Sequence, residues 1–297
     1  MHFINLLRWN NAKITIVRII SRLSPQYVLV ASNRDPAGIT MTDYLKGELG
    51  FREVDNNTDS LRTFDSPQYR SARLSVASTD LLHLENLDEV YPQATAFIFL
   101  SKHKSDSRIP TLTCHCTGNF GDNQFGGNPR EIAVSFPSLQ KSYLRALDAE
   151  GSRVPDYDIV IEASHHGPTS LAKPVLFVEL GSSAEQWADK NAASAICDVV
   201  LRILENGFER CKKVGIALGG THYPVKFNKL LLESEFGLAA VASKHSLESV
   251  DEAMLDQMIS KSLERVTSIV LDSKGLGAHK DRLVNMAEKS GLEVVKV

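Results

Sequence analysis

The stretch DIVIEASHHGPTS, residues 158–170, contains the pattern that decides the fold and raises the question of function. Its first seven residues form a mainly apolar run, which predicts a buried strand. Gly167-Pro168 predicts a sharp turn directly afterwards. His165 and His166 therefore lie where the strand ends. Because side chains alternate along an extended chain, only the turn can aim both imidazoles toward one site.

Further runs of the same kind occur along the chain. They are YVLVAS (27–32), ARLSVAS (72–78), AFIFLS (96–101), IAVSF (132–136), VLFVEL (175–180), VGIALGG (214–220) and SIVLDS (268–273). Most are too continuously apolar to be exposed on one face, which predicts strands that are covered on both sides. Helical patterns separate them, at 138–150, 183–206, 246–263 and 278–290. The alternation predicts an α/β protein.

The organisation of the chain is simple. No internal repeat or long linker divides it, so we expect one compact domain over residues 27–297, preceded by an N-terminal extension over 1–26. Polar residues interrupt the extension too often for a membrane span or a signal peptide. A gene start placed too early is the alternative explanation for it. The polar segment 52–70 is expected to be a loop or an edge hairpin.

Composition excludes little by itself. The chain has 297 residues, 43% hydrophobic and 23% charged, with a formal net charge of -3, which is ordinary for a soluble globular protein. The net charge does not indicate a nucleic-acid partner, although the net charge of a whole chain does not reveal a local basic patch. The four cysteines form no CxxC motif, which favours a reducing cytosol. No Walker A loop, dinucleotide fingerprint, HExxH or GxSxG motif occurs, which argues against kinases, dehydrogenases, zincins and common serine esterases.

Histidines gather at the ends of the predicted strands. Five of the nine histidines do so: His103, His115, His165, His166 and His222. In open α/β sheets, ligands bind beyond the carboxyl ends of the strands. If the strands run parallel, these five histidines therefore lie at the same edge of the sheet. Imidazole there can bind a metal, relay a proton or contact a phosphate. The alternative for each histidine is a structural hydrogen bond to a loop.

The stretch TLTCHCTGNFG, residues 111–121, carries one of these histidines. If it is extended, Thr113, His115 and Thr117 share one face, while Cys114 and Cys116 share the other. A zinc site built on the two cysteines lacks a second pair of ligands, so the histidine face is favoured.

Glycines and a carboxylate lie beside the histidines. Gly118 lets the following loop approach a ligand closely. Gly219 and Gly220 expose backbone amides that can bind a phosphate or an oxyanion. Tyr223 can stack on a base or sugar. The alternative for this stretch is a tight turn with a packed tyrosine. Glu162 suits an orienting carboxylate for an imidazole; the alternative is a buried acid paired with a loop amide.

Five motifs occur together in a characteristic order. They are SKHKS (101–105), LTCHCTGNFG (112–121) with the later FGG, EASHHGPTS (162–170), VELGSSAEQW (178–187) and ALGGTHYP (217–224). In this order and spacing, the chain from about residue 27 resembles the archaeal and plant type of D-aminoacyl-tRNA deacylase. It departs from that family in its N-terminal extension and in the cysteines around His115.

The resemblance implies a fold and a reaction. The implied fold is a single-domain α/β/α sandwich with a mixed, mostly parallel sheet, of the phosphorylase and peptidyl-tRNA hydrolase type. The implied enzyme is a zinc-dependent carboxylic ester hydrolase that cleaves D-aminoacyl-tRNA to free D-amino acid and tRNA. It would remove mischarged D-amino acids from translation.

The resemblance also implies roles for residues. His115, His165 and His166 are expected around the zinc and the reacting water, with Glu162 as their orienting carboxylate. A larger set is expected to bind the substrate: His103, Thr113, Thr117, Gly118, Asn119, Gly219, Gly220, His222 and Tyr223.

The expected partner is the acceptor end of tRNA, and neither DNA nor a membrane. Four lysines that flank GGTHYP are candidates to meet the acceptor stem, or else form a solvated rim: Lys212, Lys213, Lys226 and Lys229. A cytoplasmic monomer is expected. Two other functions stay open: a peptidyl-tRNA hydrolase or nucleoside-cleaving enzyme on a related fold, and a noncatalytic tRNA-binding module with structural histidines.

Overall fold

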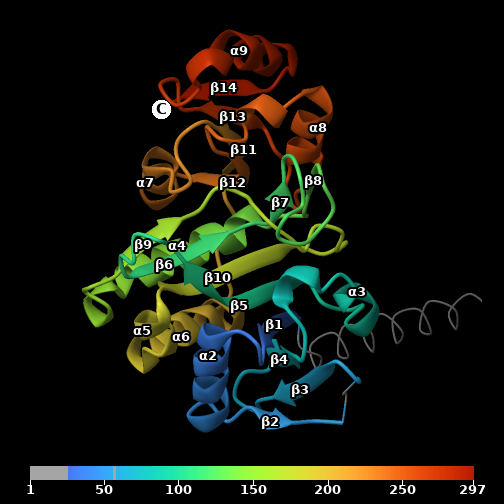
Figure 1. The fold of residues 1–297 in the computed structure, drawn as a ribbon, viewed down its shortest axis with the longest axis vertical. Helices are drawn as coiled ribbons and strands as arrows, with labels where there is room; N and C mark the ends of the chain where they lie inside the picture. Colours follow the sequence, from blue (N-terminus) through green and yellow to red (C-terminus); the bar gives the residue numbers. More distant parts are fainter. Residues whose placement is uncertain (1–25, 56–57) are drawn as a thin grey trace, which may run out of the picture.

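The computed structural model describes residues 26–55 and 58–297 (Figure 1). The predicted N-terminal extension, apart from its last residue, lies outside the described residues. Within them, none of the helices combines the length and the hydropathy that a bilayer crossing requires.

A mixed sheet of eight strands forms the centre of the molecule, in the order β2-β3-β4-β1-β5-β10-β6-β9. Its parallel centre consists of β4 (Ala72–Ala77), β1 (Tyr27–Ser32), β5 (Ala96–Lys104) and β10 (Val175–Ser182). At one edge, β6 (Thr111–His115) and β9 (Asp158–Ile161) run parallel to each other and antiparallel to β10. At the other edge, β2 (Arg52–Glu53) and β3 (Leu61–Asp65) form the hairpin that the sequence offered for 52–70.

A second sheet follows toward the C-terminus, and all four of its strands are parallel. Its order is β12 (Phe236–Ala242), β11 (Lys213–Leu218), β13 (Ser268–Leu271) and β14 (Glu293–Lys296). The sequence alone does not distinguish this sheet from the first. Val241 and Val270 nevertheless belong to the hydrophobic cluster of the first sheet, so the two sheets share one core. The prediction of a single α/β domain with a mixed, mostly parallel sheet and flanking helices is confirmed.

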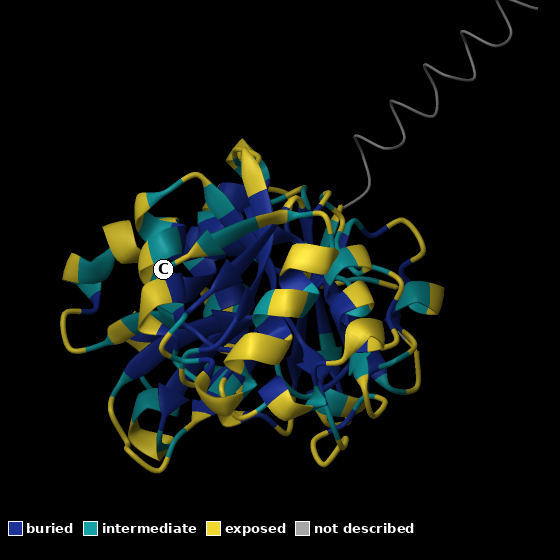
Figure 2. Cartoon of the chain, turned by 90° about the horizontal axis from the view of Figure 1, so that it is seen from above, coloured by how far each residue is buried: buried dark blue, intermediate teal, exposed yellow. Residues whose placement is uncertain are grey.

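Helices cover the sheets, and Figure 2 shows buried strands enclosed by helices with exposed outer faces. The longer ones are α2 (Pro36–Gly47), α4 (Pro137–Ala149), α6 (Lys190–Asn206), α7 (Val225–Glu233), α8 (Glu252–Ser260) and α9 (Lys280–Lys289). Short helices occur at α3 (Leu87–Val90) and α5 (Ala184–Trp187). Helices α2 and α4 both contact α6, and these three pack against one face of the first sheet.

Most predicted elements are present, with two informative differences. Seven of the eight predicted strands form, but IAVSF (132–136) contributes only the end of β8 (Glu131–Ile132), which pairs with β7 (Gly118–Asn119). The rest of that run forms a mostly buried loop, in which the Val134 carbonyl accepts the amide of Val175.

The helix predicted for 183–206 is two helices. The capping box of Ser183 and Gln186 forms as expected. The carboxylate of Asp189 then accepts the amides of Asn191 and Ala192, which caps a new helix and ends the first. Gly207 follows the second helix, as the sequence indicates.

The face of the first sheet opposite α2, α4 and α6 changes from apolar to polar along its strands. On β5, Phe97 and Phe99 are followed on the same face by Ser101 and His103. The expectation that all five histidines lie at one edge of the sheet required parallel strands, but β6 is antiparallel to β10. His115 therefore lies opposite Phe177, near the start of β10 and not at its carboxyl end. The chemistry therefore lies across this face of the sheet.

Candidate active site

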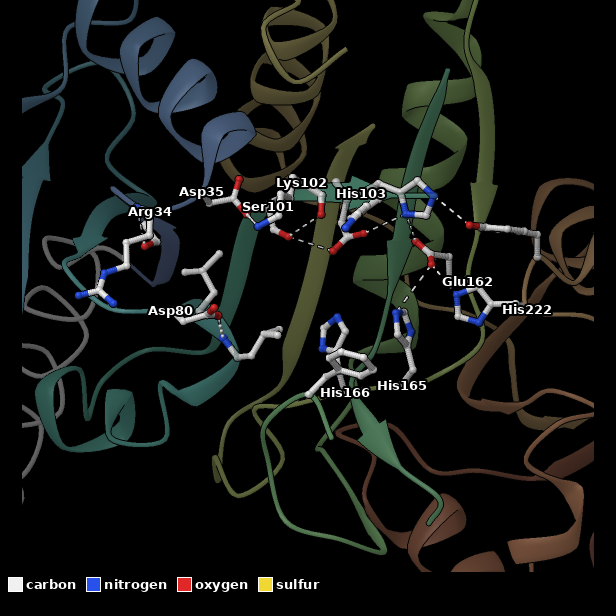
Figure 3. A pocket seen from close by; sticks show the side chains of 17 residues that line it. Arg34, Asp35, Asp80, Ser101, Lys102, His103, Glu162, His165, His166 and His222 are labelled. Carbon is white, nitrogen blue, oxygen red and sulfur yellow. Dashed lines mark hydrogen bonds and ion pairs between the residues drawn. The ribbon is translucent and has the colours of Figure 1, made fainter. Parts of the chain in front are cut away.

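A cavity of about 530 Å³ opens over the polar part of this face (Figure 3). It lies at the carboxyl ends of β1, β4 and β5, where a ligand site is expected. The chemically active side chains that line it come from four segments: Ser101, His103, Glu162, His165, His166, Glu179, His222 and Tyr223. The structure thus brings the predicted histidines together, with His115 directly behind His165 and His166.

The turn at Gly167 aims both adjacent imidazoles at this cavity. The Gly118 amide lies 3.2 Å from the carbonyl of His165 and 3.0 Å from that of His166, which holds the turn beside the end of β6. A Cβ on Gly167 would lie 2.3 Å from the nitrogen of Gly127, so only glycine fits there. The turn depends on this close approach of two loops.

Three imidazoles form a compact group, which we call the neutral group: His115, His165 and His166. Their ring centroids are 4.2 to 4.8 Å apart. The Nδ1 atom of each ring faces a backbone carbonyl, at 3.4 Å for His115, 2.9 Å for His165 and 2.7 Å for His166. Because a carbonyl only accepts, Nδ1 carries the proton and a neutral ring keeps its lone pair on Nε2.

The electrostatics of the neutral group favour uncharged rings in the turn. Burial lowers the pKa of His165 well below its ordinary value, and the neighbouring imidazoles of His115 and His166 add to this. Burial and His115 lower the pKa of His166 to about 4. For His115, burial opposes the charged form, but the nearby Glu179 carboxylate raises the pKa.

The group also fits a metal ion. One nitrogen from each of the three rings can be chosen so that all lie within 4.8 Å of one another. The Nε2 atom of His115 is buried without a hydrogen-bond partner among the described residues, and the nearest oxygen of Glu179 is 3.6 Å away. Fixed tautomers with free Nε2 atoms are typical of zinc ligands.

A second group is charged, and we call it the charged group: His103, Glu162 and Glu179. Nδ1 of His103 lies 3.2 Å from Glu162 Oε1 and 3.4 Å from Glu179 Oε2. Burial disfavours the charged ring of His103, but the two carboxylates raise its pKa to about 10. Burial likewise opposes ionisation of Glu179, but His103 and His115 lower its pKa to about 2.

Glu162 connects the two groups, but with partners other than those expected. Its Oε2 lies 2.7 Å from His222 Nε2 and 3.8 Å from His165 Nε2. Burial would raise the pKa of Glu162, whereas hydrogen bonds with His103 and His222 hold it well below the usual range. The carboxylate therefore orients His222 and His103 rather than the two adjacent histidines.

The second sheet supplies two of these residues. His222 and Tyr223 follow β11, and the His222 carbonyl accepts the Ala163 amide at 2.8 Å. The Tyr223 hydroxyl lies 2.9 Å from His103 Nε2, so this tyrosine is engaged with an imidazole.

Glu179 is a site residue that the sequence analysis missed. It receives hydrogen bonds from Ser101 at 3.0 Å and from Thr113 at 3.3 Å, and it lies between His103 and His115. A signal was present, because Glu179 is the acidic residue within the apolar run VLFVEL.

Several predicted substrate-binding residues make hydrogen bonds that support the site. The hydroxyls of Thr113 and Thr117 are buried, and Thr117 donates to the Pro168 carbonyl at 2.6 Å. Asn119 donates to the carbonyls of Gly126 and Asn128 at 2.8 and 3.0 Å. These hydrogen bonds hold the Glu179 carboxylate, the turn at Gly167-Pro168 and the loop around Gly127 in place.

The cysteines lie on the face opposite His115, as predicted. Cys114 is buried in the core beside α4, and the Sγ of Cys116 lies 3.6 Å from Gln140 Oε1. Burial raises the pKa of Cys116 to about 12, so its thiol is protonated at neutral pH. The structure gives these thiols no contact with the neutral group among the described residues.

Two features near GGTHYP bear on its expected contacts with tRNA, which stay predictions. Gly220 lines a separate cavity of about 360 Å³, next to Lys226 and Lys244, and neither it nor Gly219 lines the histidine cavity. The four lysines proposed for tRNA each have a carboxylate partner: Lys212 with Glu235, Lys213 with Glu293, Lys226 with Asp272 and Lys229 with Glu233. Their charge is thus largely compensated.

The chain is similar to known proteins in sequence and in fold. The sequence model of a family described as D-aminoacyl-tRNA deacylase matches residues 90–295. A protein named D-aminoacyl-tRNA deacylase from Cenarchaeum symbiosum is 39% identical over 271 residues, which cover 90% of this chain and 98% of that protein. One of the same name from Ignicoccus hospitalis is 40% identical over 68% of this chain and 81% of its own. A crystal structure of a conserved protein of unknown function has a TM-score of 0.83 at 26% identity, covering 92% of this chain and 95% of that one.

Proposed function

The chain belongs to the D-aminoacyl-tRNA deacylase family, and from this premise we propose that it hydrolyses the ester of D-aminoacyl-tRNA to free D-amino acid and tRNA. The observation that carries the proposal at the level of the site is the neutral group. His165 and His166 line the cavity and His115 lies directly behind them, and the three rings place their nitrogens close enough together to hold a metal ion for ester hydrolysis.

We further propose zinc as the cofactor, held by His115, His165 and His166. Zinc in such a position supplies a Lewis acid and lowers the pKa of a water molecule toward neutrality. Its ligands would be uncharged imidazoles, whose tautomer the backbone carbonyls of Cys116, Ala163 and Gly167 fix.

His222 is the residue best placed to move a proton. Its Nε2 is bound to the Glu162 carboxylate, and it lines the cavity with a side chain 39% exposed. The other nitrogen, Nδ1, has no hydrogen-bond partner among the described residues. Glu162 would hold the ring and stabilise its charged form while Nδ1 takes a proton from water and returns it to the ribose oxygen.

His103 has a positioning role in this proposal. Both of its ring nitrogens are engaged, one with two carboxylates and the other with Tyr223. A cationic His103 compensates Glu162 and Glu179, and so keeps Glu162 ionised for His222.

Single-turnover hydrolysis tests the function. One tRNA would be charged with the D form and with the L form of the same amino acid, and a peptidyl-tRNA would serve as the third substrate. We expect rapid release of the D-amino acid alone. Equal rates for both enantiomers, or cleavage of the peptidyl-tRNA, would contradict the proposal, and binding without any hydrolysis would support the noncatalytic alternative.

Elemental analysis of the same preparation tests the cofactor independently of activity. We expect stoichiometric zinc, its loss on treatment with a chelator, and recovery of both metal content and turnover when zinc is added back. Full turnover by demonstrably metal-free protein would remove zinc from the proposal.

A further inference from the structure

An exposed aromatic side chain lies next to the proposed reaction site. Phe125 is 65% exposed, although it belongs to a loop packed against the two adjacent histidines. It lines the histidine cavity and also a second, more polar cavity of about 440 Å³. A single exposed apolar side chain is common on a protein surface. What distinguishes Phe125 is that it lines both cavities beside the two adjacent histidines.

The loop that carries Phe125 is held tightly. Asn119 donates to the carbonyls on either side of Gly127, and Asn123 donates to Gly127 itself at 2.9 Å. A Cβ on Gly126 would lie 2.1 Å from the Leu82 carbonyl oxygen, so the loop backbone is pressed against the chain there. Phe125 is therefore presented by an ordered backbone.

The same loop is joined to the histidine turn. The Phe125 carbonyl accepts the amide of Gly167 at 3.0 Å, directly after His166. The position of the aromatic ring is thus tied to the position of the imidazoles. A ligand stacked on the ring would therefore lie next to the imidazoles.

The two cavities share a wall. His165 and His166 line both of them, as does Phe125. An ester that reacts at these imidazoles has its acyl part on one side and its ribose on the other. The second cavity offers Gln124, Ser246 and Ser249 as hydrogen-bonding groups, which suits a nucleoside with donors and acceptors on its edges.

We propose that Phe125 is the platform on which the 3′-terminal adenine of the tRNA stacks, with the adenosine in the second cavity. The inference rests on the proposed function and adds a substrate subsite to it. Every base has a π-face, and stacking on an aromatic side chain requires no particular hydrogen bond. The terminal adenine is common to all substrates, whereas the amino-acid side chain varies, so a fixed aromatic platform serves the base.

The test compares two small esters of the same D-amino acid. One carries it on the ribose of adenosine, and the other carries it on a ribose without a base. Phe125→Ala is expected to raise KM for the adenosine ester roughly 10-fold and to leave the base-free ester unchanged, since base stacking on an aromatic residue is of this order. Phe125→Trp should retain the wild-type KM for the adenosine ester because it keeps an aromatic face.

A matched control removes an exposed apolar side chain elsewhere. Leu263 is 48% exposed and lines neither cavity, so Leu263→Ala should leave both esters unchanged. Inhibition by free adenosine gives a second readout, and the inhibition constant should rise about as much as KM in Phe125→Ala.

The outcomes separate this inference from the proposed function. If the wild type hydrolyses the adenosine ester but Phe125→Ala weakens both esters equally or neither, the stacking platform is wrong and the deacylase function stands. An effect that depends on the amino acid and not on the base would place the acyl group on Phe125 instead and overturn the inference. If the wild type hydrolyses neither the esters nor D-aminoacyl-tRNA, the proposed function fails.

Discussion

His166 of the neutral group and His103 of the charged group are the same kind of residue in opposite states. His166 has its pKa lowered to about 4 by burial and by His115, whereas two carboxylates raise the pKa of His103 to about 10. Both rings are within one site, and both are largely removed from water. What differs is the partner, a backbone carbonyl in one case and two buried acids in the other.

The difference teaches that a cluster of histidines is not a single functional unit. Neutral rings with free Nε2 atoms can bind a metal, and a cationic ring cannot. Environments that push pKa values apart allow one site to hold ligands and charge-compensating residues side by side. Glu162, which contacts His222 and His103, lies between the two groups.

The largest effect is expected for His103→Leu. The change leaves Glu162 and Glu179 buried without their shared cation, and removing one partner of a buried ion pair typically costs about 3–5 kcal/mol. Urea unfolding should show a loss of this size in the free energy of unfolding. Adding Glu179→Gln to the variant should recover part of the loss, since one uncompensated charge is then removed.

The pH dependence of stability checks the same residue. The pKa of His103 is raised in the folded protein, so its contribution is complete below the ordinary histidine pKa of about 6.5. It decreases as the pH rises and is lost once the pH passes about 10. The stability difference between wild type and His103→Leu should therefore shrink from pH 6.5 to 10, and a constant difference would show that His103 is not cationic.

His166→Ala should affect turnover more than folding. It removes a neutral ring whose Nε2 is offered to the metal, so zinc content should fall and the single-turnover rate should drop by about 10²-fold or more. His222→Ala is the matched control, because it should lower the rate while zinc stays stoichiometric. Unchanged zinc content in His166→Ala would show that the neutral group does not bind the zinc.

His165→Ala sharpens this test. We predict that the two adjacent histidines have unequal roles, because their backbones differ by one residue. Both have Nδ1 on a carbonyl, but His165 also lies 3.8 Å from Glu162 and contacts the ring of His222. Equal losses of rate and zinc in the two variants would show that the roles are equivalent.

Much of the fold was predictable, because local patterns specify strands. The HHGP turn, the hairpin at 52–70 and the alternation around His115 all follow from local sequence. The antiparallel direction of β6 was missed, although the segment 105–110 contains the turn residues Ser105, Asp106 and Pro110 and is too short for the crossover that parallel strands require. The second sheet was also missed, because the pairing of β11 with β12 is a tertiary event between similar apolar runs.

The site was predictable as a set of histidines, but their partners were not. Glu179 and His103 face each other across two strands distant in sequence, and no local pattern reports that contact. The lysines near GGTHYP illustrate the same limit, since Lys226 is paired with Asp272, 46 residues away. A sequence shows which residues are charged, but only the fold shows which charged residues are paired.

A smaller effect is expected for Tyr223→Phe. It removes the hydroxyl that lies 2.9 Å from His103 Nε2, and one such hydrogen bond contributes about 1 kcal/mol. The free energy of unfolding should fall by that amount, with zinc content unchanged, because Tyr223 contacts the charged group. A loss of zinc would show that the two groups are less separate than their hydrogen bonds indicate.

The smallest effect on the site is expected for the pair Cys114→Ala and Cys116→Ala. The two thiols are the nearest alternative zinc ligands in sequence, but they lie on the face of β6 opposite His115, and burial keeps their pKa values raised. Alanine preserves the strand and removes only sulfur, so stability should fall by about 1 kcal/mol. Zinc content and the single-turnover rate should stay at their wild-type values, because the neutral group keeps all three imidazoles. Elemental analysis of the double variant decides the matter: a loss of stoichiometric zinc would place the metal on the cysteine face and require a different ligand set.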